Sequence, residues 1–134
     1  MSDLYAKAYV FLDGRLVKAD ELIRDPDLRK RSGVGGNPSG GVVIGTPGTY
    51  LLIDDATGFV CDDVLGQGPA LLRAGQPILY QMRLSRDSLA ITLEDGMAVA
   101  DDGAGSHVAA PVEEFAAALE AGYAEYLELL ALVG

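Results

Sequence analysis

The sequence predicts an α+β protein in which a mostly antiparallel sheet of about six to eight strands carries a long C-terminal helix on one face. Three observations predict this class. Two Asp-Gly pairs mark tight hairpins, apolar residues alternate with polar ones along several segments, and residues 111–133 show a helical period. With 134 residues, of which 49% are hydrophobic, we expect residues 1–134 to form one packed domain.

Two of the Asp-Gly pairs in the sequence place hairpins. Asp13-Gly14 follows a strand predicted over residues 5–12, and Asp95-Gly96 follows a strand predicted over residues 89–93. Both dipeptides suit the positive φ angles of a type I′ turn, so each is expected to reverse the chain into an antiparallel neighbour.

Two short helices are expected after the first hairpin. Residues 20–23 resemble one helical turn, and a second helix is expected to start at Pro26, which suits a first helical position. Asp25 is placed to cap the second helix, and Gly33 is placed to end it.

The next segment is rich in glycine. Residues 32–49 hold seven glycines and two prolines, which predicts a flexible loop that enters a sheet. Turn signals then follow at 47–48 and 56–58, so a meander of three antiparallel strands is expected. Its strands are predicted over residues 42–44, 50–53 and 59–61.

The remaining segments before the last helix are read from their periodicity. Residues 66–77 fit either a helical turn or an extended connection. Over residues 78–85 the apolar side chains of Ile78, Tyr80, Met82 and Leu84 occupy every second position, which predicts a strand with one buried face. Residues 101–110 contain several breakers and are expected to form a loop.

Residues 111–133 are predicted to form a long amphipathic helix. At 100° per residue its five glutamates share one arc, opposite the apolar residues. Leu129 falls at the margin of the apolar arc, and Leu132 falls on the acidic side. The apolar arc comprises Val112, Phe115, Leu119, Gly122, Tyr123, Tyr126, Leu127, Leu130 and Val133.

Charge is distributed unevenly along the chain. Residues 87–134 contain ten carboxylates and no lysine or arginine, whereas the first 86 residues balance, so the net charge of −10 belongs to the C-terminal part. This asymmetry favours a basic protein surface as partner, because opposite charge speeds association. The alternative is a solvated face that aids solubility. The candidate partner-binding residues are Glu114, Glu125, Glu128, Asp101 and Asp102.

A basic cluster forms a second candidate site. Arg29, Lys30 and Arg31 precede the glycine-rich segment, whose backbone N–H groups could approach a bound anion. The phosphate-binding motifs that such a cradle usually carries are missing, which favours an ordinary loop. Residues 24–31 could instead neutralise the acidic helix face within the fold.

The leading functional prediction is a small acidic binding protein of the inhibitor, immunity or chaperone type. One alternative is a ligand-binding domain with an apolar pocket between sheet and helix, and a second is a carboxylate-dependent enzyme that uses residues 54–63 with His107. The pocket of the first alternative would be lined by Phe115, Tyr123, Tyr126, Tyr80 and Met82.

Several classes of site and partner are not expected. The single Cys61 and the single His107 argue against a disulfide, a metal centre and a nucleophilic triad, so no catalytic residue, metal or cofactor is assigned. The acidic surface argues against nucleic acid. No segment resembles a signal peptide or a membrane span, which predicts a cytoplasmic protein. A homodimer through Leu129 and Leu132 is a further hypothesis.

Overall fold

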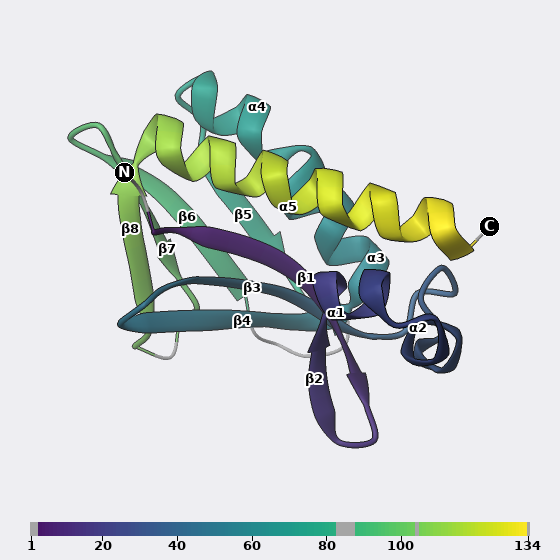
Figure 1. Cartoon of the computed structure of the whole chain (residues 1–134). Helices are drawn as coiled ribbons and strands as arrows, with labels where there is room; N and C mark the ends of the chain where they lie inside the picture. Colours follow the sequence, from purple (N-terminus) through teal and green to yellow (C-terminus); the bar gives the residue numbers. More distant parts are fainter. Residues whose placement is uncertain (1–2, 83–87, 104, 134) are drawn as a thin grey trace.

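Two four-stranded antiparallel sheets and a long C-terminal helix form the α+β fold (Figure 1). The computed structural model describes residues 3–82, 88–103 and 105–133. The first sheet has the order β2-β1-β3-β4 and the second the order β5-β6-β7-β8. The strands are β1 (Tyr5–Leu12), β2 (Arg15–Lys18), β3 (Ser39–Thr46), β4 (Thr49–Ala56), β5 (Ile78–Gln81), β6 (Ser88–Glu94), β7 (Met97–Asp101) and β8 (His107–Pro111). The predicted class is therefore confirmed, although the strands are divided between two sheets.

Both predicted hairpin turns are confirmed. Asp13 and Gly14 have φ angles of 54° and 76°, and Asp95 and Gly96 have φ angles of 50° and 79°. Two consecutive positive φ angles define a type I′ turn, which matches the twist of the strands that it joins.

The two short helices also lie where the sequence places them, as α1 (Ala19–Arg24) and α2 (Pro26–Ser32). The Asp25 carboxylate accepts hydrogen bonds from the backbone N–H groups of Asp27 and Leu28, at 3.0 and 3.2 Å. Gly33, with φ of 74°, ends α2 in the left-handed conformation.

The strand predicted over residues 59–61 is wrong. The chain is helical there, through α3 (Thr57–Val60) and η1 (Cys61–Gly66), which has π-helical hydrogen bonds, and it continues into α4 (Gly68–Arg73). Thr57 starts this segment, because its backbone N–H donates to Pro38 O at 2.9 Å and its hydroxyl to Tyr9 O at 3.1 Å. The chain thus leaves β4 as helix, and β5 begins a second sheet.

One segment predicted as loop contains a strand, and one predicted strand is longer than expected. β8 occupies residues 107–111, where Val108 and Ala110 are buried and their neighbours are exposed. β3 contains the strand predicted over residues 42–44 and extends it to residues 39–46, where Gly40 and Gly41 lie too close to the neighbouring strands to carry a side chain. An added Cβ would lie 2.2 Å from Tyr9 O at Gly40 and 1.7 Å from Ile53 O at Gly41.

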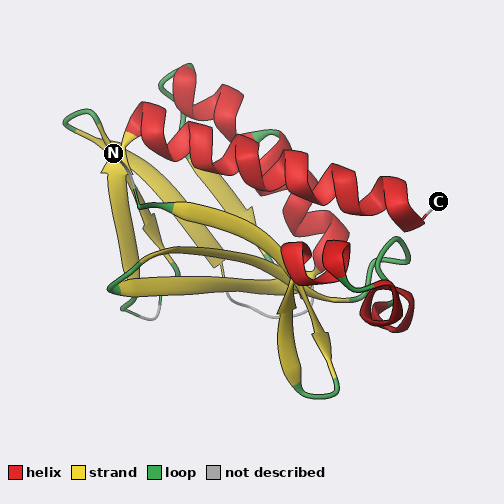
Figure 2. Ribbon diagram, viewed as in Figure 1, coloured by secondary structure: helices red, strands yellow, loops and turns green. Residues whose placement is uncertain are grey.

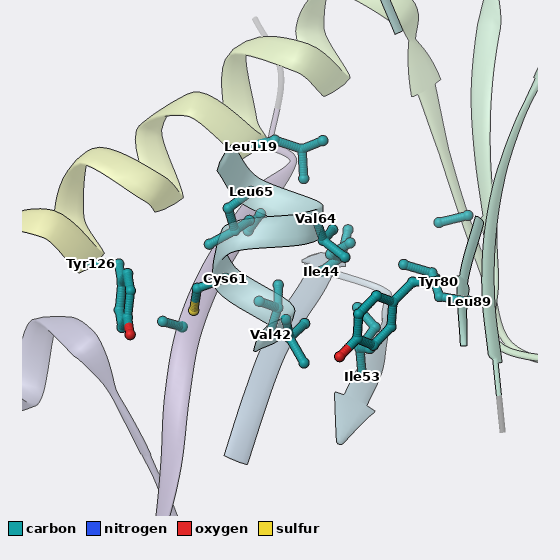
Figure 3. Close-up of a cluster of buried hydrophobic side chains, with 14 of the residues drawn as sticks. Val42, Ile44, Ile53, Cys61, Val64, Leu65, Tyr80, Leu89, Leu119 and Tyr126 are labelled. Atoms are coloured by element: carbon teal, nitrogen blue, oxygen red, sulfur yellow. The ribbon is translucent and has the colours of Figure 1, made fainter. Parts of the chain in front are cut away.

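The C-terminal helix α5 (Val112–Val133) packs over both sheets, with α4 on one flank and β1 on the other (Figures 1 and 2). Its rotation differs slightly from the prediction: Leu129 is fully buried, whereas Leu127 is 46% exposed. Figure 3 shows Leu119 and Tyr126 of α5 in one cluster with Cys61 and Leu65 of η1, and Val42, Ile44 and Ile53 of the first sheet and Tyr80 and Leu89 of the second complete it. The core therefore spans both sheets.

Gly122 sets how closely α5 approaches β1. β2 pairs only with Tyr9–Leu12, and α5 lies beside the remaining half of β1 (Figure 2). A Cβ at Gly122 would lie 2.3 Å from the carbonyl oxygen of Ala6, and neither backbone can yield without moving the helix or the strand.

None of the helices in the described ranges is long and apolar enough to cross a membrane.

We therefore expect Gly122→Ala to destabilise the protein by about 1–3 kcal/mol, although alanine favours helix formation, because the overlap is with backbone. Urea unfolding followed by circular dichroism measures the change. Gly48→Ala is the matched control, since an added Cβ there meets no atom within 4 Å. An unfolding midpoint that is equal to or above that of the wild type in Gly122→Ala would contradict the close approach.

Candidate functional site

Two glutamates of α5 bind one arginine of α4. Glu113 and Glu120 are seven residues apart, so both lie on the flank of α5 that faces α4. Arg73 Nη2 lies 2.7 Å from Glu113 Oε1, and Arg73 Nη1 lies 2.7 Å from Glu120 Oε2. The planar guanidinium therefore joins both carboxylates and links α4 to α5.

These contacts change the acidity of the groups involved. Hydrogen bonds from Arg73 lower the pKa of Glu113 and of Glu120, and hydrogen bonds to Glu120 and Glu113 raise the pKa of Arg73. All three groups therefore remain charged at neutral pH. Arg73 is the one cation between residues 32 and 82, and this isolation in the sequence was a signal for its role.

Glu125 lies on the opposite flank of α5. Its carboxylate accepts from Lys7 Nζ of β1 at 3.0 and 3.2 Å, and its side chain is only 22% exposed. Lys7 Nζ also lies 3.9 Å from Asp20 Oδ1 of α1, a buried oxygen without a hydrogen bond among the described residues. Lys7 of β1 thus lies close to one carboxylate of α1 and one carboxylate of α5.

Glu114 and Glu128 differ from the other three glutamates. Both are exposed, and neither forms an ion pair within the described part of the chain. The five glutamates of α5 contact two cations, Lys7 and Arg73, which leaves three negative charges in excess. We call the exposed ridge between the two flanks the outer face of α5. It comprises Glu114, Ala117, Ala121, Ala124, Glu128, Ala131 and Leu132.

The other predicted partner-binding residues lie elsewhere. Asp101 ends β7 and Asp102 follows it, at the end of β8 that is remote from α5 (Figure 1). The Asp101 carboxylate accepts from Gly103 N at 2.7 Å and the Asp102 carboxylate from Ser106 N at 3.2 Å, so both shape the turn. Glu114 and Glu128 share the outer face of α5 near its two ends, and the two aspartates lie on another part of the molecule.

The side chains of the basic cluster do not converge on one site. Arg29 Nη1 donates to the carbonyl oxygens of Leu22 and Ile23, at 3.1 and 3.0 Å, and so caps the end of α1. Arg31 pairs with Asp13 of the first hairpin turn, and Lys30 is exposed. The cations observed on the α5 glutamates are Lys7 and Arg73, which the sequence reasoning did not select.

Three of the four carboxylates of residues 54–63 are bound by tyrosines. The Tyr80 hydroxyl donates to buried Asp55 at 2.6 Å, the Tyr9 hydroxyl donates to Asp54, and the Tyr123 hydroxyl donates to Asp62 at 3.2 Å. Burial raises the pKa of Asp54. Across the described ranges, no three His, Cys, Asp or Glu side chains are arranged to hold a metal ion.

His107 and Cys61 occupy separate surroundings. His107 Nδ1 lies 3.9 Å from Asp101 Oδ2, and the imidazole is 64% exposed. Cys61 is buried, and burial, followed by the charge of Asp62, raises the pKa of its thiol. This thiol is therefore protonated and inert at neutral pH.

Most of the side chains expected to line an apolar pocket pack in the core. Phe115, Tyr80, Met82 and Tyr126 are at most 6% exposed. The space beside Tyr126 and Leu129 admits no water molecule. Burial raises the pKa of Tyr126 to about 12, and Tyr123 is partly buried with its hydroxyl on Asp62. These side chains serve packing between the sheets and α5.

No protein-family model matches the chain, and no curated protein or solved structure matches it. The functional argument therefore rests on the charges and contacts of α5 and the elements beside it.

Because Arg73 lowers the pKa of Glu113 and Glu120, their pairing contributes stability above the ordinary glutamate pKa of about 4.5, and this contribution is lost as the pH falls through the lowered values. Arg73→Met is therefore expected to flatten the acid limb of stability against pH. Thermal unfolding between neutral pH and pH ~3 measures it. Arg15→Met, which removes an exposed arginine 3.4 Å from Glu21, is the control. Parallel profiles for wild type and Arg73→Met would contradict the assignment.

Proposed function

We propose that the protein is a small acidic binding module, of the inhibitor, immunity or chaperone type, that presents the outer face of α5 to a basic surface of a partner protein. One observation carries this proposal: after Lys7 and Arg73 have paired with three of the five glutamates, Glu114 and Glu128 remain exposed on the same ridge. Among the described residues, no cation forms an ion pair with either of them.

The composition of the outer face supports binding over solubility alone. A solvated acidic face explains Glu114 and Glu128, and many surface carboxylates have no other role. It does not explain Leu132 on the same ridge, since this apolar side chain is 48% exposed. Apolar side chains beside unpaired charge are typical of protein interfaces, where the apolar part contributes affinity and the charge speeds encounter.

Electrostatics also indicate the sign of the charge on the partner's surface. The chain carries a net charge of −10, and the glutamates of α5 exceed their cations by three charges. This field attracts lysine and arginine side chains and repels acidic ones over roughly 8–10 Å at ordinary salt. Association is therefore expected to weaken as salt concentration rises.

The test compares two double variants of equal charge. Fluorescence anisotropy with a labelled lysine-rich peptide is measured over a range of NaCl concentrations. Glu114→Gln with Glu128→Gln is expected to weaken binding several-fold and to reduce its salt dependence, because it removes the unpaired charges of the outer face.

Asp101→Asn with Asp102→Asn is the matched control. It removes the same charge at the remote end of β8, and each asparagine keeps an oxygen that can accept the turn hydrogen bond. Equal weakening by both double variants would show that binding follows net charge alone, and the proposed surface would be wrong.

A further inference from the structure

A groove of about 480 Å³ lies between α4 and α5. Its lining includes Leu65 and Gly66 of η1, Pro69 of α4, and Tyr123 and Leu127 of α5. A Cβ on Gly66 would come within 3.1 Å of the Tyr123 ring, so glycine lets the ring lie low in the groove. We call this feature the α4–α5 groove.

The groove is apolar and only partly filled by the chain. Leu127 is 46% exposed, whereas Leu130, which is three residues further along α5, is half-buried. An apolar side chain placed in the groove would remove the exposed surface of Leu127 from water, which is favourable in proportion to the area covered.

The rim of the groove is acidic. Glu120 lies in the groove lining and shares Arg73 with Glu113. Asp62 accepts from the Tyr123 hydroxyl at 3.2 Å, and Glu128 lies one turn beyond Ala124 of the lining. Four negative charges thus lie at or near the groove against the one positive charge of Arg73, so an occupant that brings positive charge is favoured.

The walls of the groove are helices, which determines the shape of an occupant. Their backbone hydrogen bonds are made within the helices, so the groove offers no ladder to an extended peptide. On the α5 side the lining residues Glu120, Ala124 and Leu127 follow the i, i+4, i+7 spacing into which a helix ridge packs. A second copy of this chain is disfavoured because it would bring its own net charge of −10.

We infer that the α4–α5 groove binds a basic amphipathic helix of the partner protein. One apolar side chain of that helix lies between Pro69, Tyr123 and Leu127, and its lysine or arginine side chains face Glu128 and Asp62. This inference rests on the proposed function and specifies the partner's structure.

The experiment uses two labelled synthetic peptides of identical leucine and lysine composition. In one, the leucines form a stripe along a helix, and in the other their order is shuffled so that no stripe exists. Anisotropy is expected to show binding of the amphipathic peptide at least about tenfold tighter than that of the shuffled one, with helicity gained on binding, because burying a leucine is worth a factor of this size.

Two leucine variants locate the site. Leu127→Ser is expected to weaken binding of the amphipathic peptide about tenfold, because it removes an apolar side chain from the groove lining. Leu79→Ser is the control: Leu79 is a leucine of β5 with 74% exposure, and it belongs neither to the groove lining nor to the outer face of α5. Both positions are exposed, and melting curves verify that both variants fold.

The outcomes separate the two proposals. Equal binding of both peptides, or equal effects of Leu127→Ser and Leu79→Ser, would overturn the helix-binding groove while leaving a basic partner in place. Binding that depends on Leu127 but is unaffected by salt and by Glu114→Gln with Glu128→Gln would overturn the basic partner. A Leu127-dependent dimer in sedimentation experiments would make a second copy the occupant and overturn both.

Discussion

The close packing of α5 against β1 is the constraint on which the arrangement of the other elements depends. Gly122 lets the helix backbone approach the carbonyl of Ala6, and this brings Leu119 and Tyr126 down onto η1 and the first sheet. The same helix contacts β7 and β8 of the second sheet and α4 beside it. Because one helix packs on elements of both sheets, its position determines how they share a core.

The rotation of α5 about its axis then decides the roles of its glutamates. With Gly122 facing β1, Glu125 points to Lys7 on one flank, and Glu113 and Glu120 point to Arg73 on the other. The same rotation buries Leu129 and exposes Leu127. A change of one residue in this rotation would bury a carboxylate without a partner, which is costly. Charge pairing and apolar packing therefore favour the same orientation.

Local signals predicted the elements that depend on neighbouring residues alone. The Asp-Gly turns, the Asp25 cap and the period of residues 111–133 act over a few residues, so their outcome is contained in the sequence near them. The prediction of a strand from Phe59 to Cys61 was wrong, because these residues favour strands when they are considered in isolation. Burial of Val60, Cys61, Val64 and Leu65 on one side of a helix, with Thr57 bound to Tyr9, outweighs that preference.

The candidate site shows the same division. The sequence by itself determined that the C-terminal part carries the negative charge, that the last helix is amphipathic, and that Glu114 and Glu128 lie on its polar side. Only the tertiary structure decided which carboxylates remain available, because Lys7 is 118 residues from Glu125 and Arg73 is 40 residues from Glu113. It also decided that a groove exists beside Leu127, since that groove needs α4 to lie along α5. Ion pairs and grooves between distant segments depend on how the chain packs, and no local pattern contains that information.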